Sequence, residues 1–206
     1  MRRTPAEWHL MLPVLLLSPL AYLLGTFPSA GLVARSRGID IHKEGSGNPG
    51  ASNTFRLLGW KYGVLVLILD IGKGAIAAGV GAQFDTAFDG HRGAYLLGVV
   101  AVLGHVFPIT RRFKGGRGVA TTAGALAVVF PLVAAVLAVL WIAIARGLHK
   151  ASIASVVSAG LFPIIVAARG ASWLDVSVTT ALALIVIVRH LKSLLRVVRG
   201  EELGLR

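Results

Sequence analysis

Residues 118–146 read GVATTAGALAVVFPLVAAVLAVLWIAIAR, a long apolar run with one proline near its middle. A single membrane-spanning helix needs only about 20 residues. Pro131 interrupts a regular helix because it has no backbone N–H to donate. We therefore expect two shorter or tilted helices that meet near Phe130 and Pro131, and this break decides how often the chain crosses a bilayer.

The composition on either side of this run is also that of a membrane protein. The chain has 206 residues, of which 55% are hydrophobic and only 15% are charged, and its mean hydropathy is +0.77. It has no cysteine, which excludes disulfides and a thiol nucleophile. Apolar segments long enough to cross a bilayer lie at residues 10–33, 62–82, 93–109, 118–146, 151–168 and 174–191.

With the proline-broken run counted as two elements, the sequence predicts an all-α, polytopic integral membrane protein of about seven transmembrane helices. We expect a single membrane-embedded domain over residues 1–206. The first segment, residues 10–33, is long for the apolar part of a signal peptide, so we expect it to be retained as a span.

The Lys and Arg residues predict the orientation, because they concentrate on the cytoplasmic side of a membrane protein. If the N-terminus is outside and the chain crosses seven times, 16 of the 21 Lys and Arg residues fall inside, within residues 35–61, 111–117, 146–150 and 189–206. Arg2, Arg3, Arg92 and Arg169 fall outside, and Lys73 lies within a span. This topology has a cytoplasmic C-terminus and brings the polar, glycine-rich segments to one membrane face.

The first of these segments, residues 45–56, reads GSGNPGASNTFR. It offers too little apolar surface to fill a core. Its glycines allow backbone N–H groups to converge on an anion, and Arg56 offers a guanidinium suited to phosphate. The residues alone leave two alternatives, a phosphate-binding loop or a plain surface turn. The first accounts for Asn48, Asn53 and Arg56, which a linker would not need.

The second segment, residues 113–118, reads FKGGRG and precedes an apolar helix. Backbone N–H groups at a helix start, with two cations, suit a phosphate. The spacing is not that of a Walker P-loop. The alternative is a positive-inside loop with a glycine turn, which does not explain three glycines packed around Lys114.

Other polar residues have simpler interpretations. Asp70 and Lys73 lie one turn apart inside a span, where a structural ion pair or a substrate contact is expected. Residues 25–31, GTFPSAG, indicate a kinked helix end with close packing. The sequence shows no constellation of histidines and carboxylates for a metal. None of the six histidines has an Asp five positions later, so the His-Asp dyad of many glycerolipid acyltransferases is absent.

Five motifs occur in order along the chain: GTFPS, GSGNPGASNTFR, DIGKG, GHVFP followed by FKGGRGVAT, and RH with a later GEE. Together they resemble the acyl-phosphate:glycerol-3-phosphate acyltransferase family of bacterial phospholipid synthesis over almost the whole chain. The resemblance implies a seven-span inner-membrane enzyme with a cytoplasmic active site. Such an enzyme moves a fatty acyl group from acyl-phosphate to the 1-position of glycerol 3-phosphate, giving lysophosphatidic acid and inorganic phosphate, without acyl-CoA, metal or other cofactor.

The resemblance also implies the partners. These are acyl-phosphate, glycerol 3-phosphate, the membrane lipids and, functionally, an upstream acyl-phosphate synthase. The net charge of +12 is then explained by anionic head groups and phosphorylated substrates. Nucleic acid is not expected as a partner.

The site residues are implied position by position. The catalytic set is Ser46, Arg56, Lys114 and His190. The substrate- and phosphate-binding set is Gly47, Asn48, Gly50, Asn53, Gly115, Gly116, Gly118, Ser152 and Ser193, and Glu202 is structural near the site.

The chain departs from the family at Ser193, which belongs to this set, and at Arg117 and Leu191, which do not; Leu191 replaces a basic residue. Relatives usually have Asn where this chain has Ser193, and Lys where it has Arg117. Asn offers an acceptor and two donors, whereas Ser offers one hydroxyl.

Two other functions remain open from the sequence. Ser193 makes a non-catalytic paralogue, or one with a different acceptor, conceivable. A transporter of a phosphorylated anion would also use broken helices and glycine loops with cations. Transport would need polar positions that continue to the other membrane face, and the predicted outer loops are nearly bare of glycine-rich cationic motifs.

Overall fold

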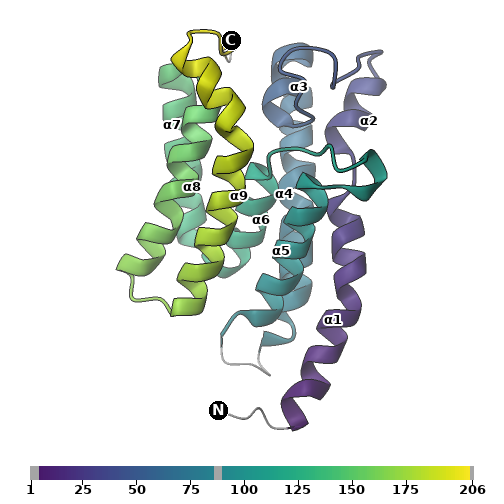
Figure 1. Ribbon diagram of the computed structural model, residues 1–206, viewed down its shortest axis with the longest axis vertical. Coiled ribbons are helices and arrows are strands. Elements are labelled where there is room, and N and C mark those ends of the chain that lie inside the picture. Colours follow the sequence, from purple (N-terminus) through teal and green to yellow (C-terminus); the bar gives the residue numbers. More distant parts are fainter. Residues whose placement is uncertain (1–4, 86–89, 205–206) are drawn as a thin grey trace.

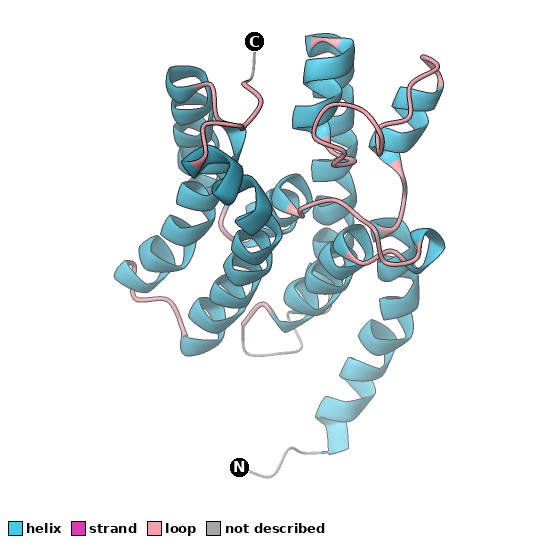
Figure 2. Cartoon of the chain, turned by 45° about the horizontal axis from the view of Figure 1, so that its top comes forward, coloured by secondary structure: helices cyan, strands magenta, loops and turns pink. Residues whose placement is uncertain are grey.

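In the computed structural model, the described residues, 5–85 and 90–204, form helices and loops without a strand among them (Figures 1 and 2). Their order is α1 (Pro5–Gly25), α2 (Ser29–Arg35), α3 (Ala51–Leu58), α4 (Trp60–Ala82), α5 (Arg92–Val106), the short 3-10 helix η2 (Ile109–Arg111), α6 (Val119–Val129), α7 (Pro131–Leu148), α8 (Ala151–Ala168) and α9 (Trp173–Val198).

The apolar run of residues 118–146 is divided where its proline predicts. Helix α6 ends at Val129 and α7 begins at Pro131, with Phe130 between them. Pro131 occupies the first turn of α7, where a missing N–H costs no intrahelical hydrogen bond. The predicted break is confirmed.

Five helical segments of the described chain are long and apolar enough to cross a membrane. They are Leu12–Arg35, Trp60–Ala82, Arg92–Arg111, Pro131–Leu148 and Ala151–Ala168. Helix α6 is apolar but shorter. The predicted all-α membrane architecture is confirmed, whereas seven crossings and the orientation of the termini stay predictions. Arg2, Arg3 and Arg206, which entered the orientation argument, lie outside the described residues.

Close backbone contacts between helices organise the bundle. Helix α4 packs against both α5 and α6, α1 packs against α5, and α8 lies between α7 and α9. At the crossing of α4 and α6, a Cβ added to Gly74 would overlap the carbonyl oxygen of Thr121, and one added to Gly124 would overlap that of Ile71. Small residues of this kind let membrane helices approach closely where side chains add no hydrophobic driving force.

Large apolar side chains cover the outside of the bundle. Leu16, Ile68, Val139 and Val188 are each at least 60% exposed. In water such a surface would aggregate, whereas in a bilayer it faces lipid. The helices therefore place their apolar faces outward as well as inward.

The polar connections lie toward one end of this bundle. Figure 1 shows the start of α1 and the end of α9 at opposite ends of the molecule, and the connections before α3, before α6 and after α9 in its upper half. The segments that the sequence marks as binding loops are thus neighbours in space, although they lie far apart in the chain.

Candidate active site

Asn53 shapes the first glycine-rich loop from inside. Its amide oxygen accepts a hydrogen bond from the Ser46 N–H at 2.8 Å, and its Nδ2 donates to the carbonyl oxygens of Ile41 at 3.3 Å and Glu44 at 3.1 Å. The side chain is 1% exposed. Both of its donors are therefore used within the protein, and its contribution to a ligand is to hold the loop.

Glycine is required in this loop for two reasons. Gly45 and Gly47 have φ of +60° and +68°, a region that other residues enter at a cost. A Cβ on Gly45 would also overlap the amide oxygen of Asn53. Asn48 and Gly50 belong to the same loop, and Gly50 is the N-cap residue of α3. The fold therefore brings the predicted residues of this segment together.

The second glycine-rich segment is held between α5 and α9. The Gly116 N–H donates to the carbonyl oxygen of His105 at 3.1 Å, and a Cβ on Gly116 would overlap the His105 ring. Arg189 Nη2 lies 3.1 Å from the carbonyl oxygen of Gly115 and 3.3 Å from that of Gly116. Gly118, with φ of +86°, starts α6. These glycines allow close approach, which fixes the path of the loop.

The path of this loop decides which of its cations faces inward. Arg117 Nη2 donates to Ser193 Oγ at 2.6 Å, and Arg196 Nη2 donates to the same oxygen at 2.9 Å. Ser193 is 1% exposed. Lys114 is exposed on the outside of the loop. The structure thus brings Arg117 and Arg196 together, and neither belonged to the site set implied by the sequence.

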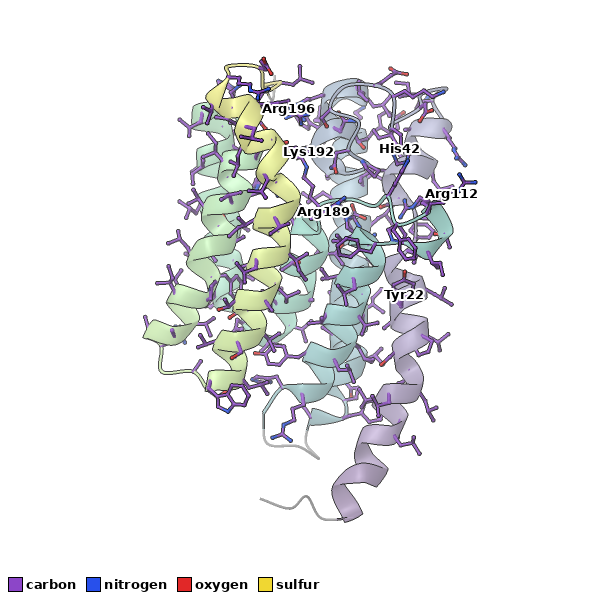
Figure 3. All side chains as sticks on the ribbon, in the orientation of Figure 1. Tyr22, His42, Arg112, Arg189, Lys192 and Arg196 are labelled. Atoms are coloured by element: carbon purple, nitrogen blue, oxygen red, sulfur yellow. The ribbon has the colours of Figure 1, made fainter. Side chains whose placement is uncertain are left out.

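These residues surround a cavity of about 220 Å³ to which five segments contribute: the first loop, α3, the second loop, α9 and the chain after α9. We call it the arginine pocket. Figure 3 shows Arg189, Lys192 and Arg196 following one another along α9 toward its C-terminal end. The pocket is lined by Gly45, Ser46, Arg56, Arg117, Ser193, Arg196, Glu201, Glu202 and Leu203.

The chain after α9 forms one wall of the pocket. Arg56 Nε donates to the Gly204 carbonyl oxygen and Nη2 to that of Leu203, both at 3.0 Å. Lys150 Nζ donates to the Glu202 carbonyl oxygen at 2.5 Å. Glu202 itself is buried, and its Oε2 has no hydrogen-bond partner. Glu202 thus lies in the wall of the pocket, and its structural role stays a prediction.

Burial makes the positive charge of the pocket costly. Removal from water, with the neighbouring charge of Arg196, lowers the pKa of Arg117 to about 10, and Glu202 opposes this shift. Burial likewise lowers the pKa of Arg56. Both side chains remain cations at neutral pH. Burial removes the water that stabilises these two cations, and an anion between them would stabilise them instead. The pocket therefore suits a phosphate or carboxylate.

Lys114, His190 and Ser152 do not line this pocket. His190 is buried on α9, and its Nδ1 lies 2.7 Å from the Val186 carbonyl oxygen. A carbonyl only accepts, so Nδ1 carries the hydrogen. Ser152 is 1% exposed on α8, and its hydroxyl has no partner.

A buried ion pair lies below the second loop. Lys73 Nζ is 2.9 Å from Asp70 Oδ1 and donates to the Phe27 carbonyl oxygen at 3.3 Å. Ser29 also donates to Asp70, and His105 Nδ1 lies 3.7 Å from the same oxygen. The structural interpretation of Asp70 and Lys73 is therefore the one that the geometry matches. The neighbouring histidine comes from another helix, which no sequence spacing could reveal.

Comparisons with known proteins agree with one another. A family model described as glycerol-3-phosphate acyltransferase matches residues 15–200. A glycerol-3-phosphate acyltransferase of Bacillus cytotoxicus is 40% identical over 91% of this chain and 92% of its own length. The protein of the same name from Geobacter sulfurreducens is 38% identical over 93% of this chain and 97% of its own length.

Two crystal structures of PlsY (YgiH), an integral membrane glycerol 3-phosphate acyltransferase, share the fold. The glycerol 3-phosphate form has a TM-score of 0.85 and 33% identity, and the lysophosphatidic acid form has a TM-score of 0.82 and 32% identity. Each similarity covers 93% of this chain and 95% of the other. The likeness therefore covers nearly the whole of both chains.

Proposed function

Because this chain belongs to the glycerol-3-phosphate acyltransferase family, we propose that it transfers a fatty acyl group from acyl-phosphate to the 1-position hydroxyl of glycerol 3-phosphate. The products are lysophosphatidic acid and inorganic phosphate. The chain is a multi-pass membrane acyltransferase, and the acyl-phosphate donor is the part of the proposal that the names of its relatives do not include. A reaction that makes acyl-phosphate must supply it.

The arginine pocket is the observation that carries the proposal. Arg56, Arg117 and Arg196 line a cavity of about 220 Å³, and the Arg117 and Arg196 guanidinium groups share one serine hydroxyl. Guanidinium groups form paired, charge-assisted hydrogen bonds with phosphate oxygens. Glu201 and Glu202 offset part of this charge, and a phosphate monoester such as glycerol 3-phosphate would balance the excess. We assign its phosphate to these three arginines.

The acyl group then meets the acceptor hydroxyl at the edge of the pocket. Ser46 lies there, on the loop held by Asn53, and is placed to donate to the oxygen that becomes negative on the acyl carbonyl. The 1-position oxygen attacks the carbonyl carbon, and the bond from that carbon to the phosphate oxygen breaks. We assign the hydroxyl proton to the departing phosphate, whose oxygens can accept it, so the step needs no protein base.

Other predicted residues act on the shape of the site without lining the pocket. Gly47, Asn48 and Gly50 give the first loop its shape, and Gly115, Gly116 and Gly118 let the second loop pass close to α5. His190 and Ser152 are buried beneath the site and position it. Lys114 contributes charge at the entrance rather than a contact with the reacting groups. Acyl-phosphate is already activated, so positioning and charge supply the catalysis.

We also propose the predicted topology for this domain. Seven crossings with the N-terminus outside put the arginine pocket on the cytoplasmic face of the inner membrane. The concentration of Lys and Arg in the connections near the pocket supports this orientation. Glycerol 3-phosphate would then enter from the cytoplasm, and the acyl chain would lie between helices open to lipid.

The test is a reaction with purified protein in lipid bicelles. Palmitoyl-phosphate is supplied with and without glycerol 3-phosphate, and inorganic phosphate and lysophosphatidic acid are both measured. The proposal expects phosphate release that depends on the acceptor and matches the lysophosphatidic acid formed. It also expects Ser46→Ala to reduce turnover far more than it reduces the amount of folded protein.

Other outcomes separate the alternatives. Phosphate release that ignores the acceptor would mean hydrolysis and contradict acyl transfer. Folded protein that leaves the donor intact would favour a binding-only paralogue or another acceptor, and Ser193→Asn would then be assayed. Uptake of glycerol 3-phosphate into protein-containing vesicles without product would instead show a transporter.

A further inference from the structure

A second cavity lies on another side of the molecule and shares no lining residue with the arginine pocket. It has a volume of about 710 Å³ and lies between α2, the segment that follows α2 and η2. Its lining includes Thr26, Leu32, Arg35, Asp40 and Arg111. We call it the lateral cavity. The proposed reaction uses none of these residues.

The lateral cavity carries positive charge with an unused hydrogen-bond donor. Arg111 Nη2 donates to the Thr26 carbonyl oxygen at 3.1 Å, whereas its Nε is buried and has no partner. Arg35 adds a second, exposed guanidinium. Guanidinium groups of this kind bind phosphate oxygens through charge-assisted hydrogen bonds.

The carboxylate in the lining does not cancel this charge. Asp40 Oδ2 lies 3.6 Å from Lys43 Nζ, and its Oδ1 accepts the His42 N–H at 3.1 Å. Asp40 is therefore already paired with a cation and a backbone donor. The excess charge of the lateral cavity is positive.

The surroundings of the lateral cavity are apolar and exposed. Leu32, which lines it, is 47% exposed. Phe27, between Thr26 and Pro28 of the lining, is 42% exposed, and Leu23, four residues before Phe27, is 52% exposed. Ile109, beside Arg111 in η2, is 61% exposed. In Figure 3, His42, Arg112 and Tyr22 mark this side of the molecule, next to α1 and α2. A ligand here meets cations and lipid-facing side chains together.

We propose that the lateral cavity binds an anionic phospholipid of the surrounding bilayer. Its phosphate lies between Arg35 and Arg111, and its acyl chains lie along Leu23 and Phe27. A soluble phosphate would not need the exposed apolar side chains, and a zwitterionic head group would not need two arginines. Such binding is independent of acyl transfer, so it can be measured without turnover.

Native mass spectrometry tests the proposal directly. The protein is released from bicelles that contain equal amounts of dioleoyl phosphatidylglycerol and dioleoyl phosphatidylcholine, and the retained lipid is weighed. We expect one phosphatidylglycerol on the wild type and at least fivefold less on Arg35→Gln and Arg111→Gln. Arg112→Gln is the matched control. It removes the same charge one residue along the chain, from a side chain that does not line the cavity.

The variants also guard against misfolding. Arg111→Gln removes the hydrogen bond to Thr26 and could disturb the fold for that reason. Arg35 is exposed, so we expect Arg35→Gln to keep the fold. Thermal unfolding in added phosphatidylglycerol should show a stabilisation in the wild type and Arg112→Gln that Arg35→Gln lacks. Equal retention in all four proteins, or equal retention of both lipids, overturns the proposal.

Discussion

The Arg117 guanidinium donates to the Ser193 hydroxyl at 2.6 Å and so joins the second glycine-rich loop to α9 across 76 residues of sequence. Arg196 donates to the same oxygen at 2.9 Å. One hydroxyl therefore orients two cations of the arginine pocket. Positions 117 and 193, where the family resemblance leads us to expect Lys and Asn, are in direct contact.

This contact predicts that the two departures compensate each other. Arg117→Lys alone would leave a shorter cation out of reach of the serine, and Ser193→Asn alone would crowd a buried position. The double variant, with Lys and Asn together, should recover much of the kcat/KM that each single change loses. A double-mutant cycle measures this coupling, which we expect to be about 0.5–3 kcal/mol. Strictly additive losses would contradict the idea that the pair acts as a unit.

The two cations of the second loop should differ sharply in their effect on substrate binding. Arg117→Ala removes charge-assisted hydrogen bonds worth about 1.5–3 kcal/mol, so the KM for glycerol 3-phosphate should rise about 10-fold to 100-fold. Lys114→Ala removes an exposed charge and should change KM about two-fold. Steady-state kinetics at fixed ionic strength compares them. A larger effect at position 114 would show that Lys114 contacts the phosphate, as the sequence alone suggested.

Gly116 should be intolerant of even a methyl group. A Cβ there overlaps the His105 ring, and such overpacking costs about 1–3 kcal/mol. Gly116→Ala should therefore lower the thermal unfolding midpoint and the activity together. Gly147→Ala is the control, because that helix position is open and alanine there stabilises by about 0.5–1 kcal/mol. An unchanged midpoint in Gly116→Ala would mean that the loop can leave the histidine at little cost.

The pH dependence of substrate binding should report the buried cation. Burial lowers the pKa of Arg117 to about 10, so its charge is present below that pH and is lost only above it. Lysine has a lower ordinary pKa than arginine, and the same burial would lower it further. The KM of Arg117→Lys divided by that of the wild type should therefore rise with pH in the alkaline range. A flat ratio from pH 7 to 9.5 would show that position 117 does not lie beside the bound phosphate.

Much of the fold follows from local features of the sequence. The helix break at Pro131 comes from one missing donor, and the ion pair of Asp70 and Lys73 comes from their helical spacing. The gathering of the polar loops follows from alternating apolar segments. Each of these features depends on residues that are close together in the chain.

The inner lining of the site depends on contacts between distant residues. Lys114 and Arg117 are both cations in one short loop, and nothing local says which one faces inward. Arg189 on α9 decides it, because it holds the carbonyl oxygens of Gly115 and Gly116. Arg196 was within reach of sequence reasoning, since it lies three residues after Ser193 on the same helix.

The hydrogen bonds from Arg56 to the chain after α9 end on main-chain carbonyl oxygens of Leu203 and Gly204. Every amino acid offers such a carbonyl, so these two positions can mutate without loss of the contact. Insertions and deletions have the opposite effect, because they shift the carbonyls away from a fixed guanidinium. In this part of the molecule, selection should preserve the number of residues after α9 while the residue types change. Homologues should therefore align there by distance from the last helix better than by residue identity.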